Sequence, residues 1–187
     1  MTFCAGYVNA YTFIVRGNTL VAGQAGNVVF LSVDLMQNNV SDVRDKLLTL
    51  IAFIMGVFLL TIYKEKLRIV KKSILSLIPL AILSIIIAFV PQTVDNIYLV
   101  PPLAFCMGLV TTAFGDYFRT KHTPFLREGF IFVSLLSSFV LGVVFSAYLT
   151  IFYHEKTILG VPIMMSVFYL SMLFASWQKK VKEKASF

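Results

Sequence analysis

The stretch Gly129–Tyr153, GFIFVSLLSSFVLGVVFSAYLTIFY, is 25 residues long and contains no charged side chain. A helix needs about 20 predominantly apolar residues to cross the roughly 30 Å hydrocarbon core of a bilayer. Inside that core every backbone N–H and C=O has to pair within its own segment, so an apolar run of this length predicts a transmembrane helix. This segment therefore predicts an integral membrane protein of the all-α class.

Similar apolar segments fill most of the chain, and seven can be counted. They are Met1–Val15, Thr19–Met36, Leu47–Tyr63, Ile74–Val90, Tyr98–Phe114, Gly129–Tyr153 and Ile158–Trp177. We predict a single polytopic bundle of six to seven transmembrane helices over residues 1–187. Its parts are a first half at 1–63, a basic loop at 64–73, a second half at 74–178 and a basic tail at 179–187.

The number of spans depends on the first two segments. Met1–Val15 provides only about 22 Å of helix at 1.5 Å per residue, so either further residues precede it or this helix crosses the membrane only in part. If Thr19–Met36 crosses fully, the N-terminus lies outside and there are seven spans. If Thr19–Met36 turns back within the membrane, the N-terminus lies inside and there are six.

Composition supports a membrane location and excludes a soluble domain. Hydrophobic residues make up 58% of the chain and charged residues 13%, against about 25% charged in soluble domains. The net charge of +7 comes from short clusters between apolar segments, which is a topology signal and not a nucleic-acid surface. We expect no nucleic-acid partner.

The basic residues recur in alternate loops, and such loops face the cytoplasm. The residues that set this orientation are Lys64, Lys66, Arg68, Lys71, Lys72, Arg119, Lys121, Arg127, Lys179 and Lys180. The loops at 91–97 and 153–157 carry little positive charge and are expected outside, as is the loop Asn38–Lys46. The sequence thus predicts a multi-pass plasma-membrane protein with a cytoplasmic C-terminus.

The stretch Gly6–Asn27, GYVNAYTFIVRGNTLVAGQAGN, is unusually polar and rich in glycine for a lipid-facing segment. It resembles the opening of the YoaK-like family of bacterial multi-pass membrane proteins, in which G-F-x-D-A-x-x-[FY] precedes a glycine-containing loop and T-G-N. The matching residues are Gly6, Ala10, Tyr11, Gly17, Gly26 and Asn27. Asn9 replaces the family's Asp, and Ala25 replaces its Thr. The resemblance implies a domain of unknown function and no particular substrate.

Two short echoes suggest a weak internal repeat. FIMGV at Phe53–Val57 aligns with FVLGV at Phe139–Val143, and Gly6 and Val8 align with Gly108 and Val110. The two echoes have different offsets, so a repeat requires a deletion in the second half. Chance matches among apolar residues are the alternative explanation.

The polar residues of the first two segments form the candidate site. Asp34 is the only acidic residue within a predicted apolar segment, and it lies seven positions after Asn27, on the same helical face. In the functional interpretation, Asn9, Gln24, Asn27 and Asp34 bind a cation, a proton or a small polar solute. In the structural interpretation, Asp34 reaches water at the outer end of its helix, and Gln24 and Asn27 hydrogen-bond between helices.

Other residues of this region are expected to serve the structure. Gly6, Gly17, Gly23 and Gly26 are expected in helix packing or in turns. Arg16, directly after the first segment, is expected to be an interfacial anchor, with a counter-charge to a buried acid as the alternative.

We predict a transporter-like protein that binds or moves a small polar solute or an ion, and the alternative is a non-transporting scaffold or regulator. The sequence contains no H-E-x-x-H, no paired intramembrane aspartates and no Ser–His arrangement, so we do not expect an enzyme. Cys4 and Cys106 lie in separate apolar segments without metal-ligand spacing, so we expect no disulfide, metal or other cofactor. The expected partners are membrane lipid and the unknown solute, and a homo-oligomer is left open.

Overall fold

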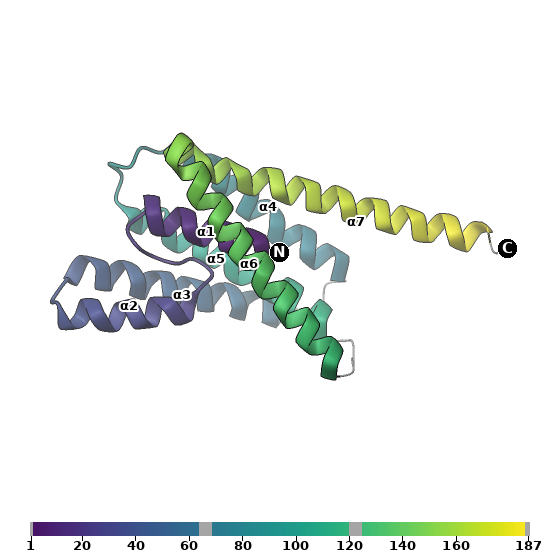
Figure 1. The fold of residues 1–187 in the computed structure, drawn as a ribbon, viewed down its shortest axis with the longest axis horizontal. Helices are drawn as coiled ribbons and strands as arrows, with labels where there is room; N and C mark the ends of the chain where they lie inside the picture. The colour runs from purple at the N-terminus through teal and green to yellow at the C-terminus, as the bar shows by residue number, and fades with distance from the viewer. Residues whose placement is uncertain (1, 64–68, 120–124, 186–187) are drawn as a thin grey trace.

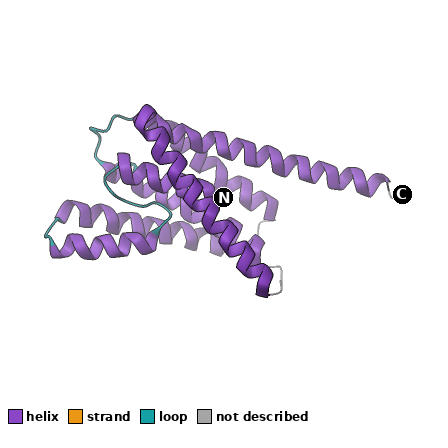
Figure 2. Cartoon of the chain, viewed as in Figure 1, coloured by secondary structure: helices purple, strands orange, loops and turns teal. Residues whose placement is uncertain are grey.

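The computed structural model describes residues 2–63, 69–119 and 125–185. Side chains are described at residues 2–62, 77–113, 133–171, 173–174 and 177–178. The regular secondary structure of these residues consists of helices joined by loops, which confirms the all-α class (Figure 2). The helices are α1 (Thr2–Val15), α2 (Gln24–Met36), α3 (Val40–Tyr63), α4 (Ile69–Ala88), α5 (Val100–Arg119), α6 (Phe125–Tyr153) and α7 (Gly160–Ala185), with short 3₁₀ turns η1 (Asn96–Tyr98) and η2 (His154–Leu159).

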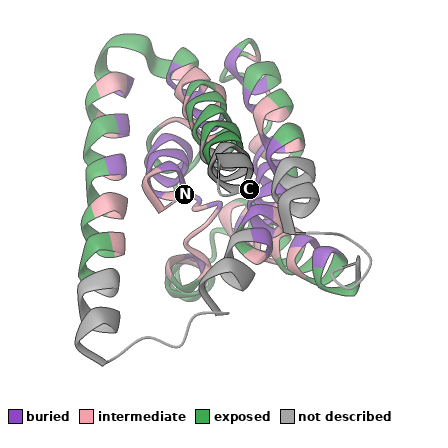
Figure 3. Cartoon of the chain, turned by 90° about the vertical axis from the view of Figure 1, so that its right-hand side faces the viewer, coloured by how far each residue is buried: buried purple, intermediate pink, exposed green. Residues whose placement is uncertain are grey.

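Three stretches of the described residues are long and apolar enough to cross a membrane: Val40–Ile62, Asn96–Ala113 and Val133–Ser171. The third has 39 residues and includes the turn η2 between α6 and α7. Large apolar side chains cover the outward faces of α3 and α6, where Phe58 and Leu141 are exposed (Figure 3). Apolar side chains on an outward face suit lipid as the surrounding solvent.

The core forms around α1, the helix in the centre of Figure 1. Its residues Tyr7, Val8 and Tyr11 have no exposed surface and pack in one cluster with apolar residues of α4, α5 and α7. The Tyr7 hydroxyl donates a hydrogen bond of 2.5 Å to the carbonyl oxygen of Thr157 in η2. This helix has 14 residues and spans about 21 Å, so its stability comes from burial within the bundle.

Two pairs of helices cross at glycines. In the α1–α6 pair, a Cβ on Gly6 would overlap the carbonyl oxygen of Phe139, and a Cβ on Gly142 would overlap that of Phe3. In the α3–α5 pair, Gly56 and Gly108 approach the partner's backbone in the same way. Small residues let helix backbones come close in a membrane, where packing drives helix association. The glycines therefore fix where these helices cross.

The two pairs run in opposite directions, because α1 and α6 end where α3 and α5 begin. Three contacts beside the loop at 91–97 establish this. They are Arg16 Nη1 to Pro91 O at 3.2 Å, Gln92 N to Glu155 Oε1 at 2.7 Å, and Arg44 Nη2 to Asp95 Oδ2 at 3.4 Å.

Two predicted boundaries are wrong. The segment Thr19–Met36 becomes helical only at Gln24, because residues 16–23 form a loop, and the resulting α2 has only 13 residues, about 20 Å. The loop predicted at Asn38–Lys46 is shorter, because α3 begins at Val40. Its charged residues thus lie in the first turns of a helix, where Lys46 reaches α2.

The predicted orientation remains a prediction. Four of the basic residues that carry it, Lys64, Lys66, Arg68 and Lys121, lie outside the described residues. The others lie in helices at positions without described side chains, namely Lys71, Lys72, Arg119, Arg127, Lys179 and Lys180.

Candidate functional site

The loop between α1 and α2 turns back along α1 (Figure 2). Gly17 and Asn18 have positive φ angles of 78° and 54°, in the left-handed region that glycine adopts readily and asparagine tolerates. The chain then returns, so that the backbone N–H of Ala22 donates a 2.8 Å hydrogen bond to Oδ1 of Asn9, in the middle of α1. The N-terminus of α2 thus starts beside the middle of α1.

Side-chain amides hold this loop in place. Asn27 accepts a 2.8 Å hydrogen bond at Oδ1 from the backbone N–H of Leu20, and its Nδ2 donates to the Leu20 carbonyl and, at 3.0 Å, to Oε1 of Gln24. The Gln24 amide in turn donates from Nε2 to the carbonyl of Val21 at 2.9 Å. Irregular backbone in an apolar surrounding has to find such partners, because no water is there to supply them.

Of the four candidate solute-binding residues, the structure brings Asn9, Gln24 and Asn27 together around this loop. Asp34 lies elsewhere, two turns further along α2. Gly23 and Gly26 belong to the loop region, and a Cβ on either would meet the Leu20 side chain. At Gly23 the Cβ would also lie 3.1 Å from Nδ2 of Asn9, so this glycine lets the loop approach α1 closely.

An open cavity of about 580 Å³ lies between α1, the loop, α2 and α6. Its lining residues are Asn9, Ala10, Phe13, Ile14, Leu20, Ala22, Gly23, Gln24, Ala25, Gly26, Phe30, Phe139, Val143 and Ala147. Asn9 and Gln24 are the polar side chains among them, and Asn27 and Asp34 do not line it. The cavity is therefore apolar with a polar edge.

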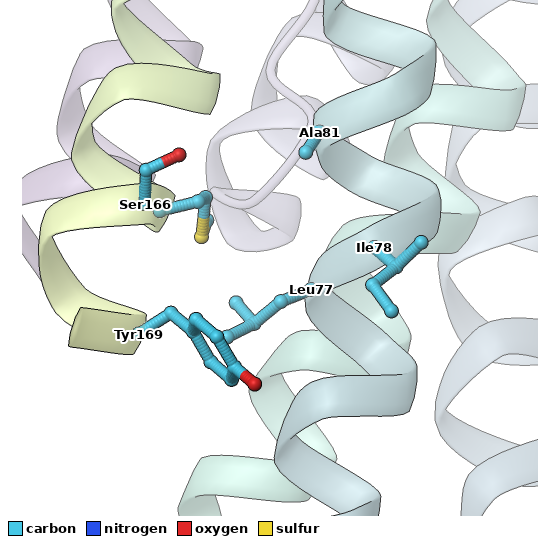
Figure 4. A pocket seen from close by; sticks show the side chains of 6 residues that line it. Leu77, Ile78, Ala81, Ser166 and Tyr169 are labelled. Carbon is cyan, nitrogen blue, oxygen red and sulfur yellow. The ribbon is translucent and has the colours of Figure 1, made fainter. Parts of the chain in front are cut away.

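Another cavity, of about 280 Å³, lies between α4 and α7 (Figure 4). Leu77, Ile78, Ala81, Met165, Ser166 and Tyr169 line it. The Ser166 hydroxyl donates to the carbonyl of Pro162 at 2.8 Å, within its own helix. Apolar side chains thus dominate this cavity too.

Asp34 forms an ion pair that joins α2 to α3. Its Oδ2 lies 2.6 Å from Nζ of Lys46, whose side chain is only 2% exposed. Asp42, one turn before Lys46, lies 3.8 Å from the same Nζ and is 38% exposed. Sequence analysis missed Lys46 because it assigned this residue to a loop, although the four-residue spacing from Asp42 is typical of an ion pair along a helix.

Arg16 is buried inside the protein and is 1% exposed, so the prediction of an interfacial anchor is wrong. Its guanidinium donates to three carbonyl oxygens at the end of α4 and to the Tyr11 hydroxyl. The carbonyls belong to Ile87 at 3.3 Å, Val90 at 2.6 Å and Pro91 at 3.2 Å. A cation is stabilised at a helix C-terminus, where the helix dipole is negative and the last carbonyls lack partners in the helix.

Metal ligation finds no support in the part of the chain that the structure describes, where no three His, Cys, Asp or Glu residues gather. Cys4 and Cys106 are both buried free thiols. The apolar stretches, the exposed apolar faces and the buried amide network together define a helical membrane protein. More particularly, the chain belongs to the family described as "Protein of unknown function (DUF1275)", the YoaK-like family, which matches residues 1–171. Comparison with curated proteins and with solved structures gave no match.

Proposed function

We propose that this protein is a non-enzymatic, transporter-like membrane protein with six spans and both termini in the cytoplasm, and that it moves a small polar solute or an ion. In this proposal two inverted three-helix repeats, α1–α3–α4 and α5–α6–α7, form the spans, and α2 is an inserted helix that does not cross. The observation that carries the proposal is the matched pair of glycine crossings.

The crossings join segments with matching sequences. Phe3-Cys4-x-Gly6-x-Val8 in α1 corresponds to Phe105-Cys106-x-Gly108-x-Val110 in α5, and Phe53-x-x-Gly56-Val57 in α3 corresponds to Phe139-x-x-Gly142-Val143 in α6. The first motif meets the second in both pairs, α1 with α6 and α5 with α3. If the sequence matches arose by chance, there would be no reason for the two motifs to contact each other in both helix pairs.

The opposite directions of the two pairs support an inverted repeat. Many transporters contain inverted repeats, with binding sites near the bilayer midplane beside interrupted helices. The short helix α2 begins beside the middle of α1, which suits such a site. The two sequence echoes have different offsets because the spacing between the motifs differs in the two halves. Gly6 and Gly56 are 50 residues apart in the first half, and Gly108 and Gly142 are only 34 residues apart in the second half. The first half accommodates α2 within the longer connection.

A scaffold or regulatory role is the second candidate. The observation that favours it is the internal pairing of the polar residues: Gln24 and Asn27 bond to the loop, and Asp34 pairs with Lys46. A solute that used Asn27 or Asp34 would have to displace these partners. In the proposed transporter, Asn9 would contact the solute, and Gln24 and Asn27 would hold the loop.

Cysteine labelling of the full chain in membranes separates the two candidates. With Cys4 and Cys106 replaced by Ala, we would introduce Ala25→Cys at the exposed cavity edge and label with a membrane-impermeant thiol reagent from each side. A transporter exposes its site to each side in turn, so position 25 should react from both. Thr93→Cys, in the loop expected outside, serves as the one-sided control, and Ile54→Cys, on the apolar face of α3, serves as the unreactive control. Absence of labelling at position 25, or labelling from one side only, would favour the scaffold.

A further inference from the structure

We propose that the cavity beside Asn9 binds a neutral, mostly apolar ring compound through one carbonyl oxygen, which accepts a hydrogen bond from Nδ2 of Asn9. Such a ligand differs from the small polar solute of the proposed function. The site requires the cavity and the donor only, so it holds for a transporter and for a scaffold alike.

The donor is identified by the hydrogen bond that its own side chain already makes. The backbone N–H of Ala22 can only donate, so the atom of Asn9 that it contacts at 2.8 Å is the oxygen, and the other end of the amide is Nδ2. Nδ2 has no acceptor among the described residues, although Asn9 is only 3% exposed. Asn9 lines the cavity, so a ligand there that supplies an acceptor can form a hydrogen bond with this amide nitrogen.

The remainder of the lining determines the rest of the ligand. The Gln24 amide is occupied on both ends, and the other described residues that line the cavity, apart from Asn9, have apolar side chains or are glycines, so most of the ligand's surface would contact apolar groups. Phe13 and Phe30 lie with ring centroids 5.6 Å apart, and Phe139 faces the cavity from α6. Aromatic side chains favour ring compounds through their large contact area and stacking geometry.

The matched probes 9-fluorenone and fluorene test this proposal, because they differ in a single carbonyl group. The full chain in detergent micelles would be dialysed against empty micelles, and the excess of each probe bound to protein would be measured. We expect fluorenone to bind about tenfold more tightly than fluorene, the ratio that one hydrogen bond of typical net strength provides. The infrared carbonyl stretch of bound fluorenone should also move to lower wavenumber than in empty micelles.

Gly23→Ala tests the donor without removing it. Gly23 has a φ of −95°, which alanine tolerates, and its new Cβ would lie 3.1 Å from Nδ2 of Asn9. The methyl group would keep a carbonyl away from Nδ2, while the Asn9–Ala22 hydrogen bond remains. We expect the two probes to bind equally and the infrared shift to disappear.

Two further variants test the cavity itself. Ala147→Phe fills it from α6 and should reduce binding of both probes at least tenfold. Ala52→Phe fills the separate cavity of about 420 Å³ between α3 and α5 and should change neither. Equal binding of the two probes to the unmodified protein, a preference that survives Gly23→Ala, or an equal loss in Ala52→Phe would overturn the proposal. Cysteine labelling at position 25 tests the transporter proposal, and probe binding tests the ligand site. The two proposals can therefore fail independently of each other.

Discussion

The ion pair between Asp34 and Lys46 should contribute strongly to stability, and Lys46→Met tests this. The lysine side chain is almost completely buried, and its Nζ lies 2.6 Å from the Asp34 carboxylate. Removal of one member of a buried pair leaves the other charge without compensation and typically costs about 3–5 kcal/mol. The nearby Asp42 increases this cost, because it would then repel Asp34. We therefore expect Lys46→Met to lower the free energy of unfolding by about 3–5 kcal/mol.

Asp42→Asn is the matched control, since it removes a carboxylate near the same ammonium group. Asp42 lies 3.8 Å from Nζ and is well exposed, so its loss should cost less than about 1 kcal/mol. The double variant Asp34→Leu with Lys46→Met removes both buried charges and should recover most of the stability, because an apolar pair of similar size is often neutral.

The assay is equilibrium unfolding in detergent under one set of conditions. It compares the unmodified protein, Asp42→Asn, Asp34→Leu, Lys46→Met and the double variant, so that the cycle over positions 34 and 46 is complete. A coupling energy of at least about 2 kcal/mol between positions 34 and 46 is the expected result. If Lys46→Met costs no more than Asp42→Asn, the ion pair does not stabilise the α2–α3 contact and this reasoning is refuted.

Five other variants, at four positions, probe the glycine crossings, the Arg16 contacts and the loop. Gly142→Ala should lower stability by about 1–3 kcal/mol, because its Cβ meets the backbone of α1. Gly26→Ala should have a smaller effect in thermal unfolding, because its Cβ meets a flexible leucine side chain. Equal effects of the two variants would contradict a close crossing of α1 and α6 at Gly142. Arg16→Leu should cost at least about 2 kcal/mol, because it removes the hydrogen bonds of the guanidinium to the carbonyls of Ile87 and Val90. Arg16→Lys should be intermediate, because an ammonium group cannot match the planar guanidinium. A lysine variant with wild-type melting behaviour would argue against this role of the guanidinium. Asn27→Ala should speed amide hydrogen exchange at Leu20, whose N–H loses its acceptor, and unchanged protection would show that the loop does not depend on this side chain.

The helical class and most helix positions could be predicted from the sequence, because apolar length and loop charge are local properties. The first segment shows where local reasoning ends. Met1–Val15 is too short for a free-standing span, and the helix that forms there is held by the surrounding helices, which bury Tyr7 and Tyr11 completely. The local sequence of a segment does not show whether segments far away in the chain will bury it.

The candidate site was predicted in part for a related reason. Asn9, Gln24 and Asn27 stood out as amides among apolar residues, and the structure brings them together. Their partners are mainly backbone groups, which every residue carries, so sequence could not identify them. The same holds for Arg16, whose acceptors are carbonyls 71 to 75 residues away. Asp34 and Asn27 share a helical face as predicted, yet the ion pair with α3 draws Asp34 into a different contact.

The position of α1 in the core has a consequence for synthesis of the chain. Helix α1 is synthesised before the other helices that it contacts. Its close crossing at Gly6 can form only with α6, where Gly142 lies more than 130 residues further along the chain. The Arg16 guanidinium likewise emerges well before the carbonyls of Ile87 and Val90 that will accept its hydrogen bonds. The native contacts of α1 with α6 can therefore form only after α6 has been synthesised, so α1 stays without this helix partner while α2 to α5 are made.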